Sequence, residues 1–388
     1  MRGKCRKEIM RILLFDAGSY TYRDLKEALE RKEHRVTTLY YHFADRYRDE
    51  FFDERIRYEL SKDSYDAVIS VNFFPLLAVA CHECGIRYIS WSYDSPLDFR
   101  LSEYFDLDTN TVYLFDRAEV EKYRRQGYSN VYHLPLAINT ERILQNLSNN
   151  REHGTYRADI SFVGSLYNSE LDALLLPVDD YIKGFVEALF QAQLRIYGCN
   201  ILEQSISDKL IDRINSEYAR IGQDKVRLTV RGLAYAIAKH ITHTERCFLI
   251  NELSGLYDVH LYTTDVCNMS QTVNVHGPVK YYDDMNLVFA TSKLNLCPTL
   301  RSIESGIPLR ALDILGAGGV LFSNYQLELA EYFEDGIECI MYGSLEEAFD
   351  KADYYLKNSD LLRKIAEKGN RKVADLFAYD ERVDSLLS

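Results

Sequence analysis

The densest group of residues that could bind an anion lies in residues 298–319. Arg301 follows a short apolar run in this segment, and a polar turn separates it from a helix that begins near Pro308. The turn contains Ser302, Ser305, Gly306 and Ile307. An arginine, free backbone N–H groups and the positive end of a helix suit a diphosphate. The segment therefore predicts a diphosphate site, with Arg301 as a candidate contact.

Arg310 and Asp313 follow on the predicted helix, and their spacing of three places both side chains on one face near its first turn. The guanidinium would suit a diphosphate, and the carboxylate would suit the hydroxyls of a ribose. The same spacing is typical of a surface ion pair on a helix that only packs against a sheet. From the sequence both interpretations stay open.

Ligands of open parallel sheets bind beyond the carboxyl ends of the strands, in loops that lead into helices. In the second half of the chain, the residues predicted at such positions are Gly164, Ser165, Tyr197, Gly198, Thr264 and Asp265. A glycine there would let a phosphate approach the backbone, and a tyrosine could stack on a base. We expect these residues to contact a nucleotide.

In the first half, Asp94 follows a predicted strand that contains Trp91, the single tryptophan of the chain. A carboxylate in that place could take a proton from an acceptor hydroxyl if burial raised its pKa. Aspartate is also a frequent N-cap, so Asp94 could instead begin the next helix. Asp16 is a second candidate for the same chemistry. The neighbouring strand ends carry the candidate acceptor contacts Gly18, Ser19, Asn72 and Tyr93.

Other chemical patterns are weak or missing. The sequence has no G-x-G-x-x-G after its first strand, no P-loop and no G-x-S-x-G elbow. The acidic pair in residues 106–108 (DLD) could bind a metal but lies in a predicted loop. The thiol pair in residues 81–84 (CHEC) lacks the second half of a zinc site. We expect no metal site.

Short apolar runs alternate with amphipathic segments, which predicts α/β architecture with a mostly parallel, doubly wound sheet in each half. Strands are expected in the first half at 11–15, 36–39, 67–71, 88–92, 111–115 and 131–134, and in the second at 160–164, 194–197, 259–262, 273–275, 293–296, 320–323 and 339–341. Polar residues 139–155 are expected to link the halves. The final helix is expected at 361–377.

The composition excludes several classes of protein. Of 388 residues, 47% are hydrophobic and 27% charged, which is enough for packed cores and unlike a disordered or fibrous chain. The net charge of −13 argues against nucleic acid or anionic lipid as a partner. The apolar runs are too short to cross a membrane, and the eight scattered cysteines are typical of reduced thiols. We therefore expect a cytoplasmic protein.

Motifs spread over nearly the whole chain belong together in one known family. In the first half they are residues 71–75 (VNFFP), 89–96 (ISWSYDSP), 114–117 (LFDR) and 132–137 (YHLPLA). In the second half they are residues 161–164 (SFVG), 293–296 (KLNL), 299–310 (TLRSIESGIPLR) and 333–338 (FEDGIE). With these motifs the sequence resembles the CgeB-like (spore maturation protein B-like) glycosyltransferases.

The resemblance implies a GT-B fold, in which two Rossmann-like domains enclose a cleft. Residues 1–150 would form the acceptor domain, residues 151–360 the nucleotide-sugar domain, and residues 361–388 a helix that crosses back to the first domain. Arg310 and Arg301 would contact the diphosphate, and Gly164 and Ser165 would form the glycine loop of the donor domain. Asp313 stands where related enzymes often carry a ribose-binding glutamate. The first domain departs from many relatives because it lacks their double-glycine loop.

The resemblance also implies the reaction. A hexose or N-acetylhexosamine would move from a nucleotide sugar, with UDP as the expected nucleotide, to a hydroxyl of a surface glycan or protein. The donor substrate would be the sole cofactor, and basic groups would replace a metal ion. An epimerase-like enzyme and a non-catalytic sugar-nucleotide-binding protein stay open as alternatives. The oligomeric state is left open.

Overall fold

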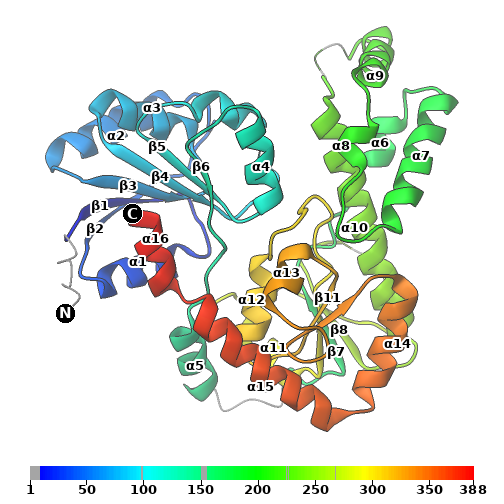
Figure 1. Cartoon of the computed structure of the whole chain (residues 1–388). Helices are drawn as coiled ribbons and strands as arrows, with labels where there is room; N and C mark the ends of the chain where they lie inside the picture. Colours follow the sequence, from blue (N-terminus) through cyan, green and yellow to red (C-terminus); the bar gives the residue numbers. More distant parts are fainter. Residues whose placement is uncertain (1–8, 98, 150–154, 224, 226, 267) are drawn as a thin grey trace. The chain divides into compact units, whose positions relative to one another are not determined.

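The computed structural model describes residues 9–97, 99–149, 155–223, 225, 227–266 and 268–388 (Figure 1). The chain forms two compact units, each with its own parallel sheet. Unit 1 comprises Met1–Asn139 and Phe377–Ser388, and unit 2 comprises Thr140–Leu376. These limits differ from the domain boundaries expected from the sequence, because the chain passes between the units at residues 139–140 and 376–377.

Unit 1 contains a six-stranded parallel sheet in the order β2-β1-β3-β4-β5-β6. The strands are β1 (Arg11–Asp16), β2 (Arg35–Tyr40), β3 (Ala67–Val71), β4 (Arg87–Ser92), β5 (Asn110–Leu114) and β6 (Val131–His133). The helices are α1 (Tyr22–Arg31), α2 (Glu50–Lys62), α3 (Pro75–Cys84), the 3-10 helix η1 (Phe99–Tyr104), α4 (Arg117–Arg125) and α16 (Tyr379–Leu387). β3 is buried at all five positions, as expected for a central strand covered on both faces.

Unit 2 contains a second six-stranded parallel sheet, in the order β12-β11-β10-β7-β8-β9. The strands are β7 (Ile160–Val163), β8 (Val259–Tyr262), β9 (Asn274–His276), β10 (Leu294–Leu296), β11 (Leu321–Asn324) and β12 (Ile340–Tyr342). The helices are α5 (Thr140–Asn149), α6 (Leu171–Leu175), α7 (Asp180–Leu194), α8 (Leu202–Ser205), α9 (Asp208–Arg220), α10 (Val230–Ser254), α11 (Met285–Thr291), α12 (Leu309–Gly316), α13 (Leu327–Tyr332), α14 (Leu345–Leu356) and α15 (Ser359–Leu376).

Helices α6 to α9 form a helical insertion between β7 and α10 (Figure 1). The insertion and the first half of α10 share a hydrophobic core that includes Ile182, Ile214 and Ile237. The caps of its helices follow from the sequence: the side chains of Asp179 and Ser207 accept hydrogen bonds from backbone N–H groups in the first turns of α7 and α9. α10 thus connects this insertion to the sheet of unit 2.

Two expectations about local structure are wrong. Residues 194–197 form no strand, because α7 continues to Leu194 and its last turn is closed by Gln193, whose amide donates to the carbonyls of Ile196 and Cys199. The segment expected as a linker instead contains α5, which packs against α11. Its Asn146 Nδ2 also donates to the carbonyl of Tyr282, which precedes α11, at 3.1 Å. Residues 150–154 of that segment lie outside the described residues.

Candidate nucleotide and acceptor sites

The sheet order of unit 2 reverses between β7 and β10, which lie side by side although most of the unit separates them in sequence. Connections leave these strands toward opposite sides of the sheet, so a crevice forms at their carboxyl ends. Gly164 and Ser165 follow β7 and Cys297 and Pro298 follow β10. The predicted glycine loop and the predicted diphosphate segment therefore both begin at this point.

Arg246 of α10 holds these two loops together. Its guanidinium donates to the carbonyl of Ser165 on one side and to the carbonyl of Pro298 on the other, with 3.0 Å from Nε to the latter. The same group lies over the ring of Tyr167 at 4.7 Å. Arg246 is buried, so these carbonyls take the hydrogen bonds that a desolvated guanidinium needs. The sequence did not single out this residue.

Asp265 fixes the loop after β7 from the neighbouring strand. Its carboxylate accepts a hydrogen bond from Ser165 Oγ at 2.7 Å and another from the Leu166 N–H. Gly164 has φ of +149°, which favours glycine and lets the chain turn immediately after the strand. Asp265 and Ser165 are thus brought together and anchor the loop after β7. Thr264, which precedes Asp265 in the sequence, is exposed.

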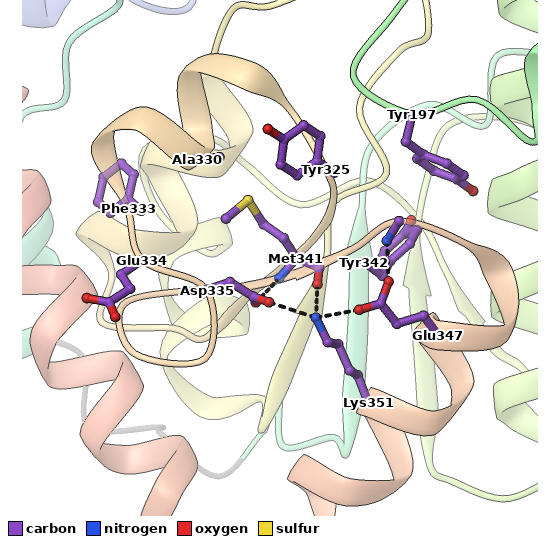
Figure 2. A pocket seen from close by; sticks show the side chains of 11 residues that line it. Tyr197, Tyr325, Ala330, Phe333, Glu334, Asp335, Met341, Tyr342, Glu347 and Lys351 are labelled. Atoms are coloured by element: carbon purple, nitrogen blue, oxygen red, sulfur yellow. Dashed lines mark hydrogen bonds and ion pairs between the residues drawn. The ribbon is translucent and has the colours of Figure 1, made fainter.

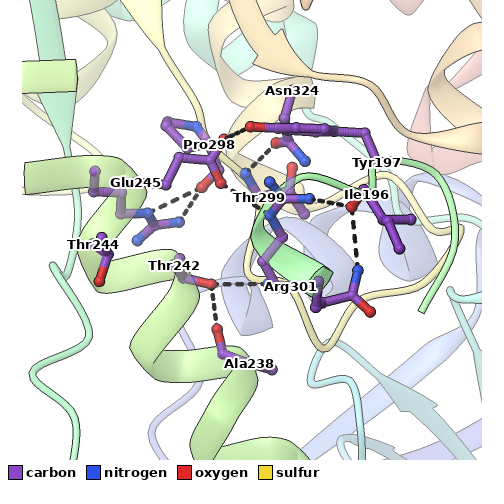
Figure 3. Close-up of polar contacts among 12 residues, drawn as sticks. Ile196, Tyr197, Ala238, Thr242, Thr244, Glu245, Pro298, Thr299, Arg301 and Asn324 are labelled. Atoms are coloured by element: carbon purple, nitrogen blue, oxygen red, sulfur yellow. Dashed lines mark hydrogen bonds and ion pairs between the residues drawn. The ribbon is translucent and has the colours of Figure 1, made fainter. Parts of the chain in front are cut away.

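Arg301 is part of a buried polar cluster (Figure 3). Its Nε donates to Glu245 Oε2 at 2.9 Å, its Nη1 donates to the Ile196 carbonyl at 3.0 Å, and its guanidinium lies 3.8 Å from the centre of the Tyr197 ring. The side chains of Arg301 and Glu245 are 5% and 0% exposed. Burial works against the charge of Arg301, but Glu245 and the nearby tyrosines outweigh it and raise its pKa.

These contacts give Arg301 a structural role inside unit 2. Its backbone N–H also donates to Thr242 Oγ1 at 2.9 Å, so α10 holds both its main chain and its side chain. The interpretation of Arg301 as a diphosphate contact stays a prediction. Thr242, Glu245 and Arg246 occupy positions of the buried face of α10, where apolar residues would be expected. Polar residues on the buried face of α10 are the feature of the sequence from which this buried cluster could have been predicted.

The turn after Arg301 is largely buried as well. Ser305 Oγ donates to Glu328 Oε1 at 2.8 Å, and the Glu328 N–H donates to the Ser305 carbonyl at 3.0 Å. Ser302, Gly306 and Ile307 are buried. The turn therefore has a fixed conformation, and any ligand contact from it would come mainly from its backbone.

Arg310 and Asp313 form the ion pair that one interpretation of their spacing predicts, with 3.6 Å between Nη1 and Oδ2. Asp313 is 2% exposed in its side chain and also accepts a hydrogen bond from Tyr281 at 3.1 Å. Arg310 differs because its side chain is 32% exposed. Asp313 thus serves to orient Arg310, whose guanidinium remains accessible in the first turn of α12.

Cys297 shows that two arginines lie near the end of β10. Burial raises the pKa of its thiol to about 11, and Arg246 and Arg310 both act in the opposite direction. Arg246 also donates to the carbonyl of Pro298, the residue that follows Cys297. Arg310 is the more exposed of the two and suits an anionic ligand better.

In unit 1, the structure brings together two of the predicted acceptor contacts, Asn72 and Tyr93, and the candidate base Asp94. Asn72 follows β3 with φ of +67°, a conformation that asparagine tolerates better than most residues. Its Nδ2 donates to Asp94 Oδ2 at 2.8 Å, and its Oδ1 accepts from the Tyr93 N–H at 2.8 Å. Asp94 therefore has an orienting partner, and the structure shows its carboxylate bound to Asn72 rather than to a helix N-terminus. Although the side chain reaches solvent, loss of hydration raises its pKa, opposed by Arg46 and Asn72.

Asp16 is the last residue of β1, at the point where the sheet order of unit 1 reverses. Its Oδ1 accepts hydrogen bonds from the N–H groups of Gly18 at 2.8 Å and Ser19 at 3.2 Å. These contacts close the turn that leads to α1. The structure gives the carboxylate this local role, and the catalytic interpretation of Asp16 stays a prediction.

At the other edge of the unit 2 sheet, His276 stacks on Tyr262 at 4.7 Å and shares a 3.1 Å hydrogen bond with His260. Loss of hydration and the nearby His260 lower the pKa of His276, and Asp258 opposes them.

The lowered pKa of His276 predicts a pH dependence of stability. A histidine whose pKa is lowered by folding stabilises the fold at pH values above its pKa in the unfolded chain, about 6.5, and this contribution is lost as the pH falls below that value. We expect urea unfolding between pH 7.5 and 5.5 to show a larger loss of stability for the native chain than for His276→Gln. Equal losses would contradict this role.

No three His, Cys, Asp or Glu side chains gather in a possible metal-binding group within the described ranges. None of the helices described is both long and apolar enough to cross a membrane.

Comparisons with known proteins agree with this architecture. Residues 246–388 match a family model described as Glycosyl transferase-like. The comparison with curated proteins gave no match. Among solved structures, the chain is similar to a glycosyltransferase from Rickettsia africae, with 12% identity, a TM-score of 0.54, and coverage of 98% of this chain and 97% of that one.

Two further structures have comparable similarity. Sucrose-phosphate synthase from Thermosynechococcus elongatus is 10% identical with a TM-score of 0.56, and each chain is covered to 97%. The Anabaena protein HepE, solved in complex with UDP and glucose, is 11% identical with a TM-score of 0.51, and 97% of this chain and 99% of that one are covered. The chain therefore has the GT-B fold of glycosyltransferases. The residues that match the glycosyl transferase-like family model, 246–388, begin at Arg246.

Proposed function

We propose that the chain is a glycosyltransferase that moves a hexose or N-acetylhexosamine from a nucleotide sugar to a hydroxyl of a surface glycan or a protein. The observation that carries the proposal is the convergence of the glycine loop, the start of α12 and the half-buried Arg310 near the carboxyl ends of β7 and β10. The glycosyl transferase-like region and the GT-B fold support it. We propose UDP as the nucleotide, because the similar Anabaena protein binds UDP and glucose.

In this proposal Arg310 and the N-terminus of α12 stabilise the departing diphosphate without a metal ion. The motifs quoted above support membership of the CgeB-like group. A reduced, cytoplasmic setting is supported by the cysteines, since Cys81, Cys84, Cys199, Cys297 and Cys339 are free thiols. Chelation with EDTA is then expected to leave nucleotide release unchanged.

Calorimetry on the full chain tests the donor site. UDP is expected to bind more tightly than GDP or ADP. A chain that binds none of the three nucleotides would contradict the donor site. Binding of a nucleotide with no turnover of any nucleotide sugar would instead favour a non-catalytic protein.

Asp94 is proposed as the base that takes the proton from the acceptor hydroxyl. Asp94→Asn is expected to lower kcat about 10²- to 10⁴-fold, while UDP affinity stays unchanged because the donor contacts lie in unit 2. The base must be ionised, so the rate of the native enzyme falls on the acid side at a pH above the ordinary aspartate pKa. Asp106→Asn, an exposed aspartate on a loop of the same unit, is the control. Full activity in Asp94→Asn would exclude this role.

A further inference from the structure

A pocket of about 540 Å³ lies in unit 2 at the carboxyl ends of β11 and β12 (Figure 2). Its volume is within the range of small-molecule sites, about 300–1,000 Å³. β12 is two strands away from β10, and a strand spacing of about 4.8 Å separates their ends by roughly 10 Å. The pocket therefore lies beside the diphosphate contacts at β7 and β10, and Tyr197, a predicted nucleotide contact, is one of its lining residues.

One side of the pocket is built from tyrosine rings that are already fixed. The hydroxyls of Tyr197 and Tyr342 both donate to Glu245 Oε1, at 3.2 and 3.1 Å. Tyr325 packs so closely on Gly198 that a Cβ there would lie 2.7 Å from its ring, and Gly198 has φ of +72°. Rings held in place before a ligand arrives lose little entropy on binding.

The opposite side is a network around Lys351 (Figure 2). Lys351 Nζ donates to Asp335 Oδ2 at 2.7 Å, to Glu347 Oε1 at 2.8 Å and to the Met341 carbonyl. Each carboxylate also accepts one backbone N–H, from Met341 and Gly343 respectively, at 2.7 Å. The three donors of the ammonium are used, whereas each carboxylate oxygen keeps a lone pair for a further donor.

We propose that this pocket, referred to below as the tyrosine pocket, binds a neutral sugar ring. A pyranose presents C–H groups on its face, which pack on an aromatic ring, and hydroxyls on its rim, which donate to carboxylates. The tyrosine rings and the paired carboxylates of Asp335 and Glu347 offer these two complementary surfaces. The inference does not rest on the transfer reaction, because it concerns the binding of a sugar at the carboxyl ends of β11 and β12.

Charged ligands fit this pocket less well. An anion would face Glu334, Asp335 and Glu347 with Lys351 as the only cation among the lining residues, and that cation is already paired. A quaternary ammonium could use the aromatic rings, but the Lys351 ammonium between the two carboxylates would repel it. A ligand that donates hydrogen bonds without carrying charge meets neither obstacle.

Saturation-transfer NMR and calorimetry on the full chain, without any nucleotide sugar, test the proposal. The probes are methyl glycosides of neutral hexoses and N-acetylhexosamines, their oligosaccharides, and tetramethylammonium. We expect at least one neutral sugar to bind, with affinity lowered about five- to tenfold by Tyr325→Ala and retained by Tyr325→Phe, which keeps the ring. Tyr354→Ala, an exposed tyrosine of α14 outside the pocket, is the matched control and should bind like the native chain.

UDP affinity separates this proposal from the proposed function. Tyr325→Ala is expected to leave UDP affinity unchanged, and an equal loss for UDP would show that the pocket belongs to the nucleotide site. No binding by any neutral sugar, or binding of tetramethylammonium alone, would also overturn the proposal. If oligosaccharides bind more tightly than methyl glycosides, the proposal is supported and the ligand is part of a glycan chain. If the two bind equally well, the proposal is supported and the ligand is a single sugar.

Discussion

Replacing Glu245 by leucine is expected to lower the free energy of unfolding of unit 2 by about 3–5 kcal/mol. The substitution leaves the buried guanidinium of Arg301 without its carboxylate, and removing one partner of a buried ion pair has effects of this size. Two tyrosine hydroxyls, those of Tyr197 and Tyr342, lose their acceptor at the same time. Urea unfolding followed by far-UV circular dichroism measures the change.

Three comparisons make this expectation specific. Trp91, the only tryptophan, is buried in unit 1, so its fluorescence should report an unfolding transition that moves much less. The double variant Glu245→Leu with Arg301→Met should recover most of the loss, because the guanidinium that paired with Glu245 is removed together with its carboxylate. Glu252→Gln, on an exposed position of the same helix, is the control. A loss below about 1 kcal/mol in Glu245→Leu would contradict the structural role of the pair, since exposed pairs have effects in that range.

Replacing Arg310 by alanine is expected to weaken UDP binding about 10- to 100-fold. A hydrogen bond to a charged group contributes about 1.5–3 kcal/mol, and each 1.4 kcal/mol corresponds to tenfold in affinity. Arg310→Lys should lose less, because it keeps the charge but not the planar fork of donors. Calorimetry measures the affinity, and circular dichroism shows whether the fold survives the loss of the partner of Asp313.

Arg363→Ala is the matched control for Arg310→Ala. Arg363 lies on α15 of the same unit and also pairs with a carboxylate three residues away, Asp360, with 3.7 Å between Nη2 and Oδ1. We expect this variant to bind UDP like the native chain. Unchanged UDP affinity in a folded Arg310→Ala would show that Arg310 only pairs with Asp313 on the surface of α12.

The positions of most strands along the chain could be predicted from the sequence, because each parallel strand is a short apolar run between amphipathic segments. β3 and α3 begin and end where the pattern predicts. The helix that follows the diphosphate segment was also expected near Pro308, and α12 begins at Leu309. Local patterns were sufficient to predict these elements, because a buried strand and an amphipathic helix each produce a characteristic spacing of apolar residues in a short stretch of sequence.

The contacts of the site could be predicted only in part. Asn72, Tyr93 and Asp94 were each predicted just after a strand, and the hydrogen bonds of Asn72 bring the three together in the structure. The partners of Arg301 could not be inferred, because Glu245 lies 56 residues away on a helix whose pattern is mainly apolar. Pairing between distant segments depends on the tertiary packing, which local spacing does not encode.

Release of free nucleotide from a panel of UDP-, GDP- and other nucleotide sugars, with and without cell-surface extracts, tests the central claim most directly. We predict a clear preference for one UDP-sugar, release that depends on an acceptor, and a loss in Arg310→Ala that Arg363→Ala does not share. Turnover of a nucleotide sugar without any acceptor would instead indicate an epimerase-like enzyme. No release from any donor, with or without extracts, would contradict the assignment as a glycosyltransferase.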